Sequence, residues 1–388
     1  MKIPIARTSL LKNEIESVLK PLNSGWLVQG SEVRDFETKW TNFTSAKNSI
    51  AVTSCTSGLD LCLSALNLKP GDEVIVPAFT WISSANVVEH HGAKVVFCDI
   101  SLDTFNIDEN LIEKLITKKT RGIIPVHLFG LPANMDKINE LAHKYNIWVV
   151  EDAACGFGSF YKGRHVGTLG DLGCFSFHPR KAITTGEGGM VCTNDDTLAK
   201  NIIILRDHGA EVSDLQRHLG PKPYILSDHT MAGYNQRMTD IQGALGSSQM
   251  DRAYSILEER RRLAEIYNIA FKDFEWLSTP QITPETEHGF QSYACMFDKK
   301  YISLKNVNDI NIKRNNLMDF LQSKGVSTRP GTHAVHMLTY YKEKYNLRPQ
   351  DFPNAYFAND CSISLPLFHG MKQEEQSYVI ETMEKFKK

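Results

Sequence analysis

Short apolar runs alternate with longer amphipathic segments between residues 49 and 150, and this alternation restricts the possible folds more than any other feature of the sequence. The runs are rich in β-branched residues and predict strands at residues 49–53, 73–76, 94–98, 123–127 and 147–150. The segments between them have helical periodicity and predict helices at residues 58–66, 82–90, 109–115 and 135–144. Such alternation is typical of an α/β fold with a mostly parallel sheet, in which ligands bind at the carboxyl ends of the strands.

The sequence outside this region predicts a second, smaller domain. Amphipathic helices are expected at residues 10–22 and 31–46, before the alternating region, and a charged helix is expected at 252–270, after it. Beyond that helix we predict further helices and three strands, the strands at residues 293–297, 325–328 and 362–365. Because 388 residues are more than one domain usually holds, we predict a large α/β domain at 1–250 and a small α+β domain at 251–388.

Charge and apolar content exclude several classes of function. The net charge of −2 and the pI near 6.7 give no positive surface for nucleic acid or for an anionic membrane. No uninterrupted apolar run approaches the ~20 residues that span a bilayer, and the N-terminus lacks the apolar core of a signal peptide. The eight cysteines form no CxxC pair, which is typical of reduced thiols in a cytoplasmic protein.

A lysine lies in an unusual place between two predicted strands. The apolar run 172–177 ends at His178-Pro179, where proline stops a strand, and a second apolar run begins at Met190. The loop between these runs holds Lys181 and the glycine-rich turn 184–189. A surface lysine in a hairpin loop and a semi-buried lysine whose amine reacts with a carbonyl group are both compatible with this stretch. The rest of the chain must decide between them.

Other strand ends carry residues that suit a phosphorylated, planar ligand. The segment 54–58 (SCTSG) opens a helix, so Thr56, Ser57 and the free amides there form either a phosphate cradle or an ordinary helix cap. Trp81, after the second strand, is either a stacking surface or a core side chain. Asp152 follows the run IWVVE, and a buried carboxylate at that position needs a cationic partner.

These residue types together fit one cofactor. A phosphate cradle, a flat aromatic side chain, a buried carboxylate and a loop lysine match the phosphate, the ring, the ring nitrogen and the aldehyde of pyridoxal phosphate. A metal site fits less well, because no cysteine or carboxylate ligands accompany His333 and His336. A dinucleotide site also fits badly, because the turn GEGGM lacks the GxGxxG spacing. We therefore predict pyridoxal phosphate as the cofactor and no metal ion.

Nearly the full length of the chain resembles the sugar aminotransferases of the DegT/DnrJ/EryC1/StrS family, which are fold type I pyridoxal-phosphate enzymes. The motifs that carry the resemblance are SGWLVQG (24–30), TSCTSGL (53–59), PAFTW (77–81), PVHLFG (125–130), EDAACGFGS (151–159), GCFSFHPRKAITTGEGGMV (173–191), GYNQRMTDIQGALG (233–246), RPGTHAVH (329–336) and SLPLF (364–368). Motifs this numerous, in this order, are specific for the family and much less specific for the substrate.

The resemblance implies roles for the residues at the strand ends. Lys181 would bind the aldehyde of the cofactor and move a proton, Asp152 would pair with the ring nitrogen, and Trp81 would stack on the ring. Small residues would hold the phosphate, namely Thr56, Ser57 and Ser176. Cys155 stands where family members often carry glutamine near the phenolic oxygen of the cofactor, so that single contact is weaker here.

The resemblance also implies contacts with a second subunit and with the substrate. Asn235 would reach the phosphate of the neighbouring subunit's cofactor, which implies a homodimer with composite active sites. Substrate contacts are predicted for four residues around the site, namely Trp26, Arg237, His333 and His336. For Trp26 and His336 a structural role is equally compatible with the sequence.

The reaction that the resemblance implies is transfer of an amino group from glutamate to a 4-keto or 3-keto sugar linked to a nucleotide. Lys181 argues against the function of a related sugar dehydratase, because a histidine replaces this lysine in those enzymes. An aminotransferase that acts on a small phosphorylated ketone or a cyclitol stays open, since no residue excludes it. A non-catalytic, cofactor-binding regulator is disfavoured, because the chain has no spare segment for a DNA-binding module.

Overall fold

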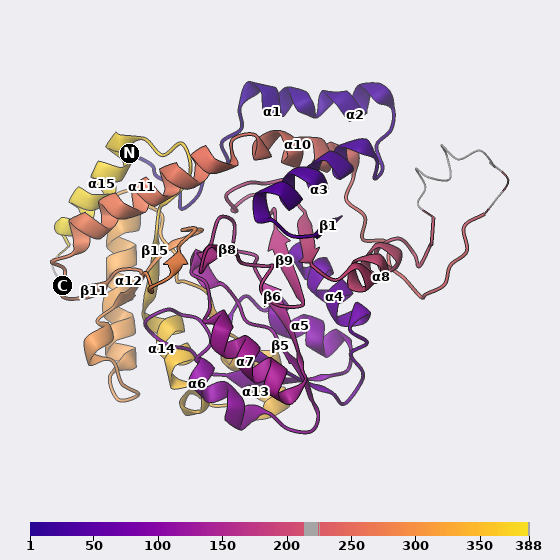
Figure 1. The fold of residues 1–388 in the computed structure, drawn as a ribbon. Helices are drawn as coiled ribbons and strands as arrows, with labels where there is room; N and C mark the ends of the chain where they lie inside the picture. The colour runs from indigo at the N-terminus through magenta and orange to yellow at the C-terminus, as the bar shows by residue number, and fades with distance from the viewer. Residues whose placement is uncertain (213–223, 225, 387–388) are drawn as a thin grey trace.

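A computed structural model of the protein describes residues 1–212, 224 and 226–386, and its largest element is a seven-stranded sheet in the order β1-β10-β9-β6-β5-β2-β4 (Figure 1). The strands are β1 (Asn48–Val52), β2 (Glu73–Pro77), β4 (Lys94–Cys98), β5 (Thr120–Ile123), β6 (Trp148–Asp152), β9 (Leu172–Ser176) and β10 (Gly189–Thr193). The predicted α/β fold is confirmed. The strand expected at 123–127 lies earlier, because Pro125 has no N–H group to extend the ladder.

Six of the seven strands run in the same direction. Strand β10 is antiparallel to both of its neighbours, β1 and β9, whereas all the other neighbouring pairs are parallel. The carboxyl ends of β1, β2, β6 and β9 therefore meet at one edge of the sheet. Because β10 turns back from β9, the connection between them also lies at this edge, and it is the loop that holds Lys181.

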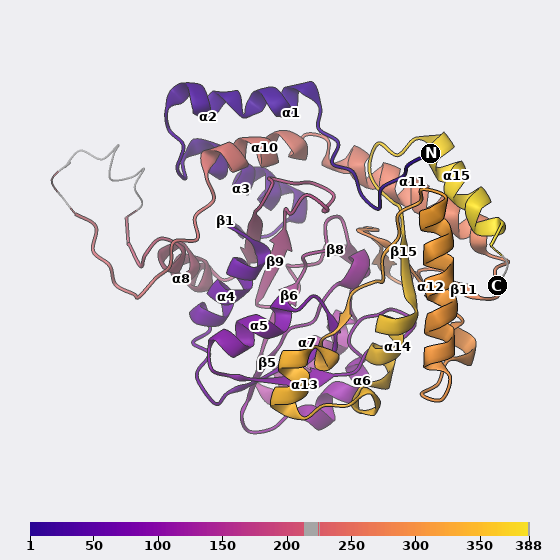
Figure 2. The same ribbon diagram turned by 180° about the vertical axis from the view of Figure 1, so that it is seen from behind.

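Helices cover both faces of the sheet, as Figures 1 and 2 show from opposite sides. One face carries α4 (Cys55–Ala65), α5 (Ser83–His90) and α8 (Asp196–Arg206). The other side carries α3 (Ser31–Thr44), α6 (Glu109–Ile112), α7 (Met135–Tyr145) and α10 (Asp240–Met250). In β2, Val74 and Val76 pack toward the first set and Ile75 toward the second. Every residue of β2 is buried, which explains why such strands have continuous apolar sequences.

The N-terminal segment forms an outer layer above the sheet. The helix predicted at 10–22 is two short helices, α1 (Lys12–Ser17) and α2 (Leu19–Ser24). The break follows from Pro21, which has no N–H to bond to Ser17 and whose ring crowds that carbonyl group. Both helices lie outside α10, and the N-terminus lies beside α15 (Gln373–Glu384) near the other end of the chain (Figures 1 and 2).

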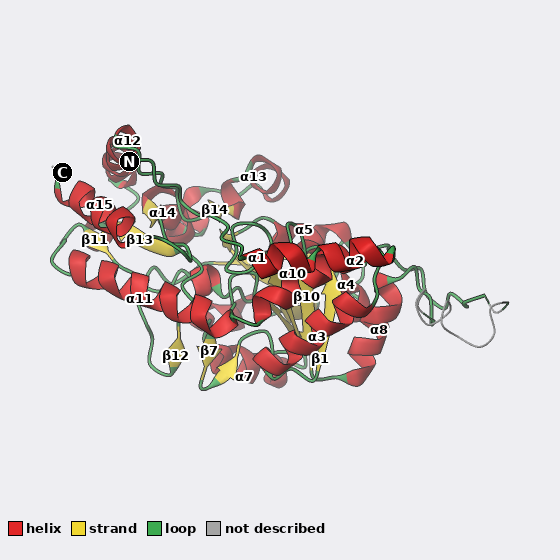
Figure 3. Ribbon diagram, turned by 90° about the horizontal axis from the view of Figure 1, so that it is seen from above, coloured by secondary structure: helices red, strands yellow, loops and turns green. Residues whose placement is uncertain are grey.

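The C-terminal part packs beside the sheet, and the long helix α11 (Ala253–Phe271) extends from the first part toward α15 (Figure 3). Its other helices are α12 (Val307–Ser323), α13 (Thr339–Tyr345) and α14 (Pro353–Cys361). Its sheet consists of β11 (Leu277–Ser278), β13 (Tyr293–Phe297) and β15 (Ser362–Leu365). The strand predicted at 325–328 is wrong, because Val326 forms only a single bridge, to Ile3 at the other end of the chain.

Two small sheets connect the first and second parts of the chain. The first joins β3 (Phe79–Thr80) to β14 (His333–Ala334). The second consists of β7 (Phe160–Tyr161), β8 (Arg164–His165) and β12 (Thr286–Glu287). Within the described part of the chain, no helix has both the length and the apolar character that a membrane span requires.

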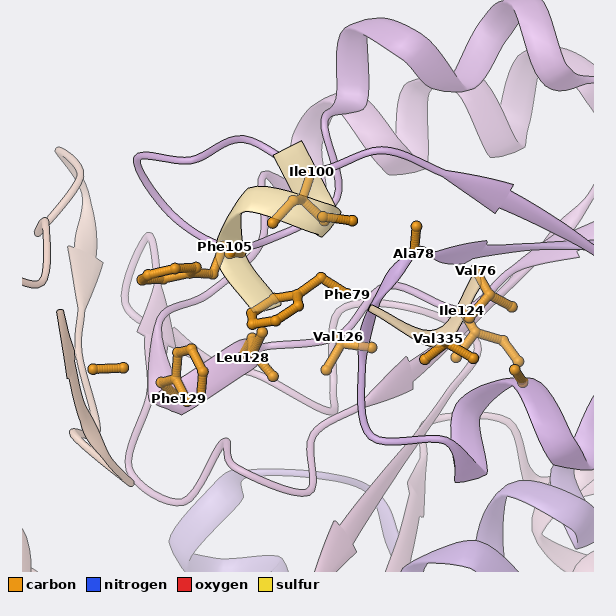
Figure 4. Close-up of a cluster of buried hydrophobic side chains, with 14 of the residues drawn as sticks. Val76, Ala78, Phe79, Ile100, Phe105, Ile124, Val126, Leu128, Phe129 and Val335 are labelled. Carbon is orange, nitrogen blue, oxygen red and sulfur yellow. The ribbon is translucent and has the colours of Figure 1, made fainter. Parts of the chain in front are cut away.

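The hydrophobic core is continuous between the two parts. Val335, from the C-terminal part, packs in one cluster with Val76 and Ile124 of the large sheet (Figure 4). The same cluster extends through Leu321 of α12 to Val379 of α15. The domain boundary that we predicted after residue 250 falls between α10 and α11, and the division into two domains stays a prediction. The last two residues of the predicted second domain, 387 and 388, lie outside the described residues.

Candidate active site

Lys181 lies at the carboxyl edge of the large sheet, in the loop between β9 and β10. The Lys181 amide donates to the carbonyl oxygen of His178 at 2.8 Å, which closes a tight turn around Pro179. The lysine side chain is partly buried, and its Nζ lies 3.2 Å from Cys155 Sγ. The amine therefore points toward the segment that follows β6, and this favours the interpretation as a reactive, semi-buried lysine.

Asp152 is the last residue of β6, and only 3% of it is exposed. Its carboxylate accepts a hydrogen bond at 2.6 Å from Ser84 Oγ, in the first turn of α5, and one at 3.1 Å from the Ala154 amide. No lysine, arginine or histidine among the described residues lies within ion-pair distance of it. A buried carboxylate without a cationic partner is unfavourable, so Asp152 suits a pocket that receives a positive group from a ligand.

Glu151 points to the opposite side of the sheet from Asp152, because successive side chains of a strand alternate. It is fully buried and accepts four hydrogen bonds, from His127 Nε2 at 2.8 Å and, each at 2.7 Å, from the amides of Gly167, Leu169 and Gly170. Burial opposes ionisation, but the hydrogen bond from His127 and the backbone amides lower the pKa of Glu151 overall. His127 is thus a hydrogen-bonded core histidine.

The amino end of α4 faces the same edge as Lys181. Ser54 caps the helix, because its Oγ accepts the Ser57 amide at 3.1 Å, and the two hydroxyl groups lie 2.9 Å apart. Gly189, at the start of β10, lies against this turn, since a Cβ there would come within 2.5 Å of the Ser54 carbonyl carbon. The helix cap and the phosphate cradle are therefore compatible, because Ser54 caps the Ser57 amide while the amides of Cys55 and Thr56, in the same first turn, have no intrahelical partner.

The Cys55 thiol lies close enough to the Lys181 amine and the Asp152 carboxylate to be affected by both charges. Burial raises the pKa of Cys55 well above its ordinary value, and among the nearby charges Asp152 raises it further while Lys181 lowers it. Cys55 Sγ also lies 3.6 Å from the carbonyl oxygen of Cys174 in β9. Since β6 and β9 are neighbours in the sheet, the structure brings Asp152 and Lys181 to one place at the carboxyl edge, near this thiol.

Trp81 directly follows β3, and 54% of it is exposed. Its ring meets that of His333 edge-on, with the ring centroids 5.5 Å apart, because β14 pairs with β3 beside it. The interpretation of Trp81 as a core side chain is therefore wrong. Its role as a stacking surface stays a prediction, and the contact shows that the C-terminal part of the chain reaches the site.

Asn235 and Arg237 lie beside the carboxyl end of β1, where Arg237 forms a bridge with Val52. Asn235 is exposed, as a residue that contacts a neighbouring subunit must be in one isolated chain. Arg237 forms an ion pair with Asp207 of the same chain, which holds its guanidinium in place. The predicted contacts of both residues stay predictions.

The remaining predicted residues differ in exposure. Ser176, at the end of β9, is partly buried, and its Oγ accepts the His178 amide at 3.4 Å. The indole of Trp26 donates to the carbonyl oxygen of Gln29 at 3.3 Å. His336 is fully buried against Phe352, and burial lowers the pKa of its ring to about 4. Its ring is inaccessible to a substrate in this structure, so the contact predicted there stays untested.

Three side chains at the site escaped the sequence analysis. Ser84, which donates to Asp152, could have been found, because it lies at the start of the helix that follows the second strand, three residues after Trp81. Gln249 and Gln291 bind the backbone of the lysine loop, but they lie 65 or more residues away in the sequence. No local pattern marks such contacts.

Comparison with known proteins places the chain in a family. Its sequence matches the DegT/DnrJ/EryC1/StrS aminotransferase family over residues 8–384. The chain belongs to this family. Among its relatives, GDP-perosamine synthase of Escherichia coli O157:H7 is 36% identical over 385 residues, which cover 99% of this chain and 98% of the relative. The spore coat polysaccharide biosynthesis protein SpsC of Bacillus subtilis (strain 168) is 34% identical over 382 residues, which cover 98% and 96%.

Solved structures of other proteins agree with this assignment. The putative sugar aminotransferase Spr1654 from Streptococcus pneumoniae, in its PMP-form, is 30% identical with a TM-score of 0.89, and the match covers 98% of each chain. The PLP-form of the same protein matches with a TM-score of 0.88, covering 99% of this chain and 98% of that one. Helicobacter pylori PseC, described as an aminotransferase of pseudoaminic acid biosynthesis, is 26% identical with a TM-score of 0.89 over 99% of each chain.

As a member of the DegT/DnrJ/EryC1/StrS family, the protein is a sugar aminotransferase that uses pyridoxal phosphate. The predictions of the family, the fold, the enzyme class and the cofactor are confirmed. The residues present fit this cofactor, because Asp152 has no cationic partner within the described part of the chain and Lys181 offers an amine at the same edge of the sheet. No group of three or more histidine, cysteine, aspartate or glutamate side chains that could hold a metal ion lies among the described residues.

Proposed function

We propose that the protein transfers the amino group of glutamate to a 4-keto or 3-keto deoxysugar linked to a nucleotide, in the biosynthesis of amino sugars or surface polysaccharides. The observation that carries this proposal is that the Lys181 amine lies near the buried Asp152 carboxylate, which has no cationic partner among the described residues. Similarity to GDP-perosamine synthase supports a nucleotide-linked substrate, and similarity to SpsC supports a polysaccharide pathway.

Pyridoxal phosphate supplies an aldehyde that takes up the amino group and a ring that withdraws electrons from the neighbouring carbon. In our proposal Lys181 Nζ would bind the aldehyde carbon of the cofactor, and the same amine would hold and move the proton beside the carbon that bears the amino group. Asp152 keeps the ring nitrogen protonated, because a buried carboxylate favours a positive charge beside it. The hydrogen bonds from Ser84 and from the Ala154 amide hold that carboxylate in place.

The other site residues orient the cofactor and the substrate in this proposal. Trp81 packs on one face of the ring, which its exposure and its position at the strand ends allow. The phosphate is held by the first turn of α4 and by the end of β9, through Thr56, Ser57 and Ser176. Cys155, already in contact with Lys181, would lie beside the phenolic oxygen of the cofactor.

We also propose a homodimer in which Asn235 completes the partner's site. Helices α1 and α2 form the outer layer (Figure 3). An apolar stripe, defined as Leu11, Ile15, Leu19 and Leu22, extends from the residue before α1 into α2, and its members are 47%, 58%, 52% and 47% exposed. Its members recur every three or four residues, so they share one side of this layer. An exposed apolar surface of this kind marks a protein contact, and a second copy of the chain covers it in our proposal.

The proposed location is the cytoplasm. All eight cysteines are free, including Cys62 and Cys174, whose sulfur atoms lie 3.4 Å apart without a bond between them. Free thiols that lie this close support a reducing compartment.

Incubation with a panel of keto-sugar nucleotides and glutamate tests the proposed function. We expect 2-oxoglutarate to accumulate with one 4-keto or 3-keto nucleotide sugar, and not in the Lys181→Ala variant. Activity of Lys181→Ala equal to that of the wild type would refute the role of the lysine. Turnover of a small phosphorylated ketone or a cyclitol, without turnover of any nucleotide sugar, would refute the proposed substrate and favour the alternative.

A further inference from the structure

The Gln291 side chain holds the backbone on both sides of Lys181. Its Nε2 donates to the carbonyl oxygen of Arg180 at 2.7 Å, and its Oε1 accepts the amide of Ala182 at 3.1 Å. These groups belong to the two peptide units that flank the Lys181 Cα atom. One side-chain amide therefore fixes the direction in which the lysine leaves the backbone, and with it the place of the amine.

Gln249, on α10, makes a similar pair of contacts elsewhere in the same loop. Its Nε2 donates to the carbonyl oxygen of Thr184 at 2.6 Å, and its Oε1 accepts the Thr184 amide at 3.0 Å. Gln249 is 2% exposed and Gln291 is 8% exposed, so both amides act in a nearly dry environment. Gln249 stabilises the loop without flanking the lysine, which makes it a matched control for Gln291.

A buried arginine holds Gln291 in turn. Arg260, on α11, donates to the carbonyl oxygen of Phe290 at 2.8 and 3.0 Å and to that of Gln291 at 2.7 Å. It is 3% exposed, and burial lowers the pKa of its guanidinium to about 10. Across the described ranges no carboxylate lies within ion-pair distance of it, so its hydrogen bonds go to backbone carbonyl groups. A buried cation of this kind is unfavourable unless its hydrogen bonds are satisfied.

We propose that Gln291 is a positioning residue for the Lys181 amine and that Arg260 anchors it. Gln291 directly precedes β13, so it connects the C-terminal part of the chain to the lysine loop of the large sheet. The inference rests on the proposed function, because it takes Lys181 as the residue that binds the cofactor. The proposed function then also depends on two residues outside the motif 173–191, because Arg260 and Gln291 set the position of the Lys181 amine.

Two isosteric variants test this proposal. Gln291→Glu keeps an acceptor for the Ala182 amide, loses the donor to the Arg180 carbonyl oxygen, and adds a titratable carboxylate beside the lysine loop. Gln249→Glu makes the equivalent change at Thr184. The measurement mixes cofactor-free protein with pyridoxal phosphate, traps the product with borohydride at successive times, and quantifies the modified Lys181 peptide by mass spectrometry across the neutral pH range.

We expect Gln291→Glu to capture the cofactor about tenfold more slowly, because the loss of one buried hydrogen bond typically changes a rate by such a factor. Its capture rate should also gain a pH dependence from the introduced carboxylate. Gln249→Glu should keep the wild-type pH profile and stay within about twofold of the wild-type rate. Arg260→Lys, which cannot reach all of its carbonyl groups, should slow capture in the same way as Gln291→Glu.

Several outcomes would overturn the inference. Equal slowing in Gln291→Glu and Gln249→Glu would mean that general loop stability, and not the position of Lys181, sets the rate. A wild-type rate in Gln291→Glu would exclude the positioning role, and a wild-type rate in Arg260→Lys would exclude the anchor. If circular dichroism shows that Gln291→Glu does not fold, Gln291→Met, which loses both hydrogen bonds without adding a charge, decides the result by the same criteria. No capture at Lys181 in the wild type would refute the proposed function itself.

Discussion

Glu151 and Asp152 are adjacent carboxylates at the end of β6. We expect the amide variant of Glu151 to lose stability and the amide variant of Asp152 to lose activity. Glu151→Gln should unfold more easily, because Glu151 accepts four buried hydrogen bonds on one side of the sheet. Asp152→Asn should stay folded and lose activity, because Asp152 accepts two hydrogen bonds on the other side and, in our proposal, pairs with the ring nitrogen of the cofactor.

The magnitude for Glu151→Gln follows from the number of donors. Each carboxylate oxygen accepts two N–H groups, so whichever oxygen becomes an NH2 group faces two donors and leaves both unpaired. An unpaired buried donor costs roughly 1–3 kcal/mol, which gives a loss of about 4 kcal/mol in the free energy of unfolding. With an unfolding entropy of about 2.1 cal/mol/K per residue, a chain of 388 residues loses about 5 °C in melting temperature.

Asp152→Asn leaves a satisfied arrangement. The amide oxygen still accepts the Ala154 amide, and the new NH2 group donates to Ser84 Oγ. The Ser84 hydroxyl then donates to the carbonyl oxygen of Trp81, 3.3 Å away. We therefore expect a change below about 1 kcal/mol in the free energy of unfolding. Activity should fall by about 10²–10³-fold, because the charge that keeps the ring nitrogen protonated is gone.

Thermal unfolding followed by circular dichroism at neutral pH measures the melting temperature of each variant. Release of 2-oxoglutarate measures its aminotransferase activity. Glu140→Gln is the control, because Glu140 is exposed and pairs only with Lys137 at the surface, so neither quantity should change. The reasoning is refuted if Glu151→Gln melts at the wild-type temperature, or if Asp152→Asn melts below Glu151→Gln.

The remaining predictions concern pH, the cofactor cradle and the dimer. Since the pKa of Glu151 is lowered in the folded protein, its stabilisation is present above its ordinary value of 4.5 and is lost in more acidic solution. The difference in melting temperature between Glu151→Gln and the wild type should therefore shrink in acid; an unchanged difference contradicts this. Gly189→Ala should bind pyridoxal phosphate at least about tenfold more weakly in an absorbance titration, because its Cβ would press on the turn at Ser54. Leu19→Asp should dissociate the proposed dimer in sedimentation experiments, whereas Ile312→Asp, at an equally exposed position on α12, should not.

The sequence predicted the features that depend on neighbouring residues and on one general rule of sheets. Asp152 and Lys181 were found because parallel strands bring their carboxyl ends to one edge, so the residue after each strand could be listed without knowing the strand order. The order itself, with β10 inserted antiparallel between β1 and β9, was not predicted. Runs of β-branched residues show that a strand exists but do not show which strand lies beside it.

The errors have physical causes that act over long distances in the chain. The segment 325–328 has a strand-like composition, but only Val326 pairs with another segment, and its partner, Ile3, belongs to the opposite end of the sequence. Whether a short apolar run becomes a strand depends on whether another backbone edge lies beside it. Gln291 illustrates the same limit, because its contacts with the lysine loop span 109 and 111 residues and leave no periodic pattern.

The chemistry of the groups around Lys181 explains why amides hold this loop. A carboxylate beside the loop would form an ion pair with the amine and hold it away from a carbonyl carbon, while a second amine would compete for the same aldehyde. Gln249 and Gln291 neither titrate nor react, so the loop keeps one geometry over the whole neutral pH range. The buried charge of Arg260, which holds Gln291, is bound by backbone carbonyl groups. In our proposals the neutral Gln291 side chain positions the lysine, and Asp152 is the carboxylate available to the ring nitrogen of the cofactor.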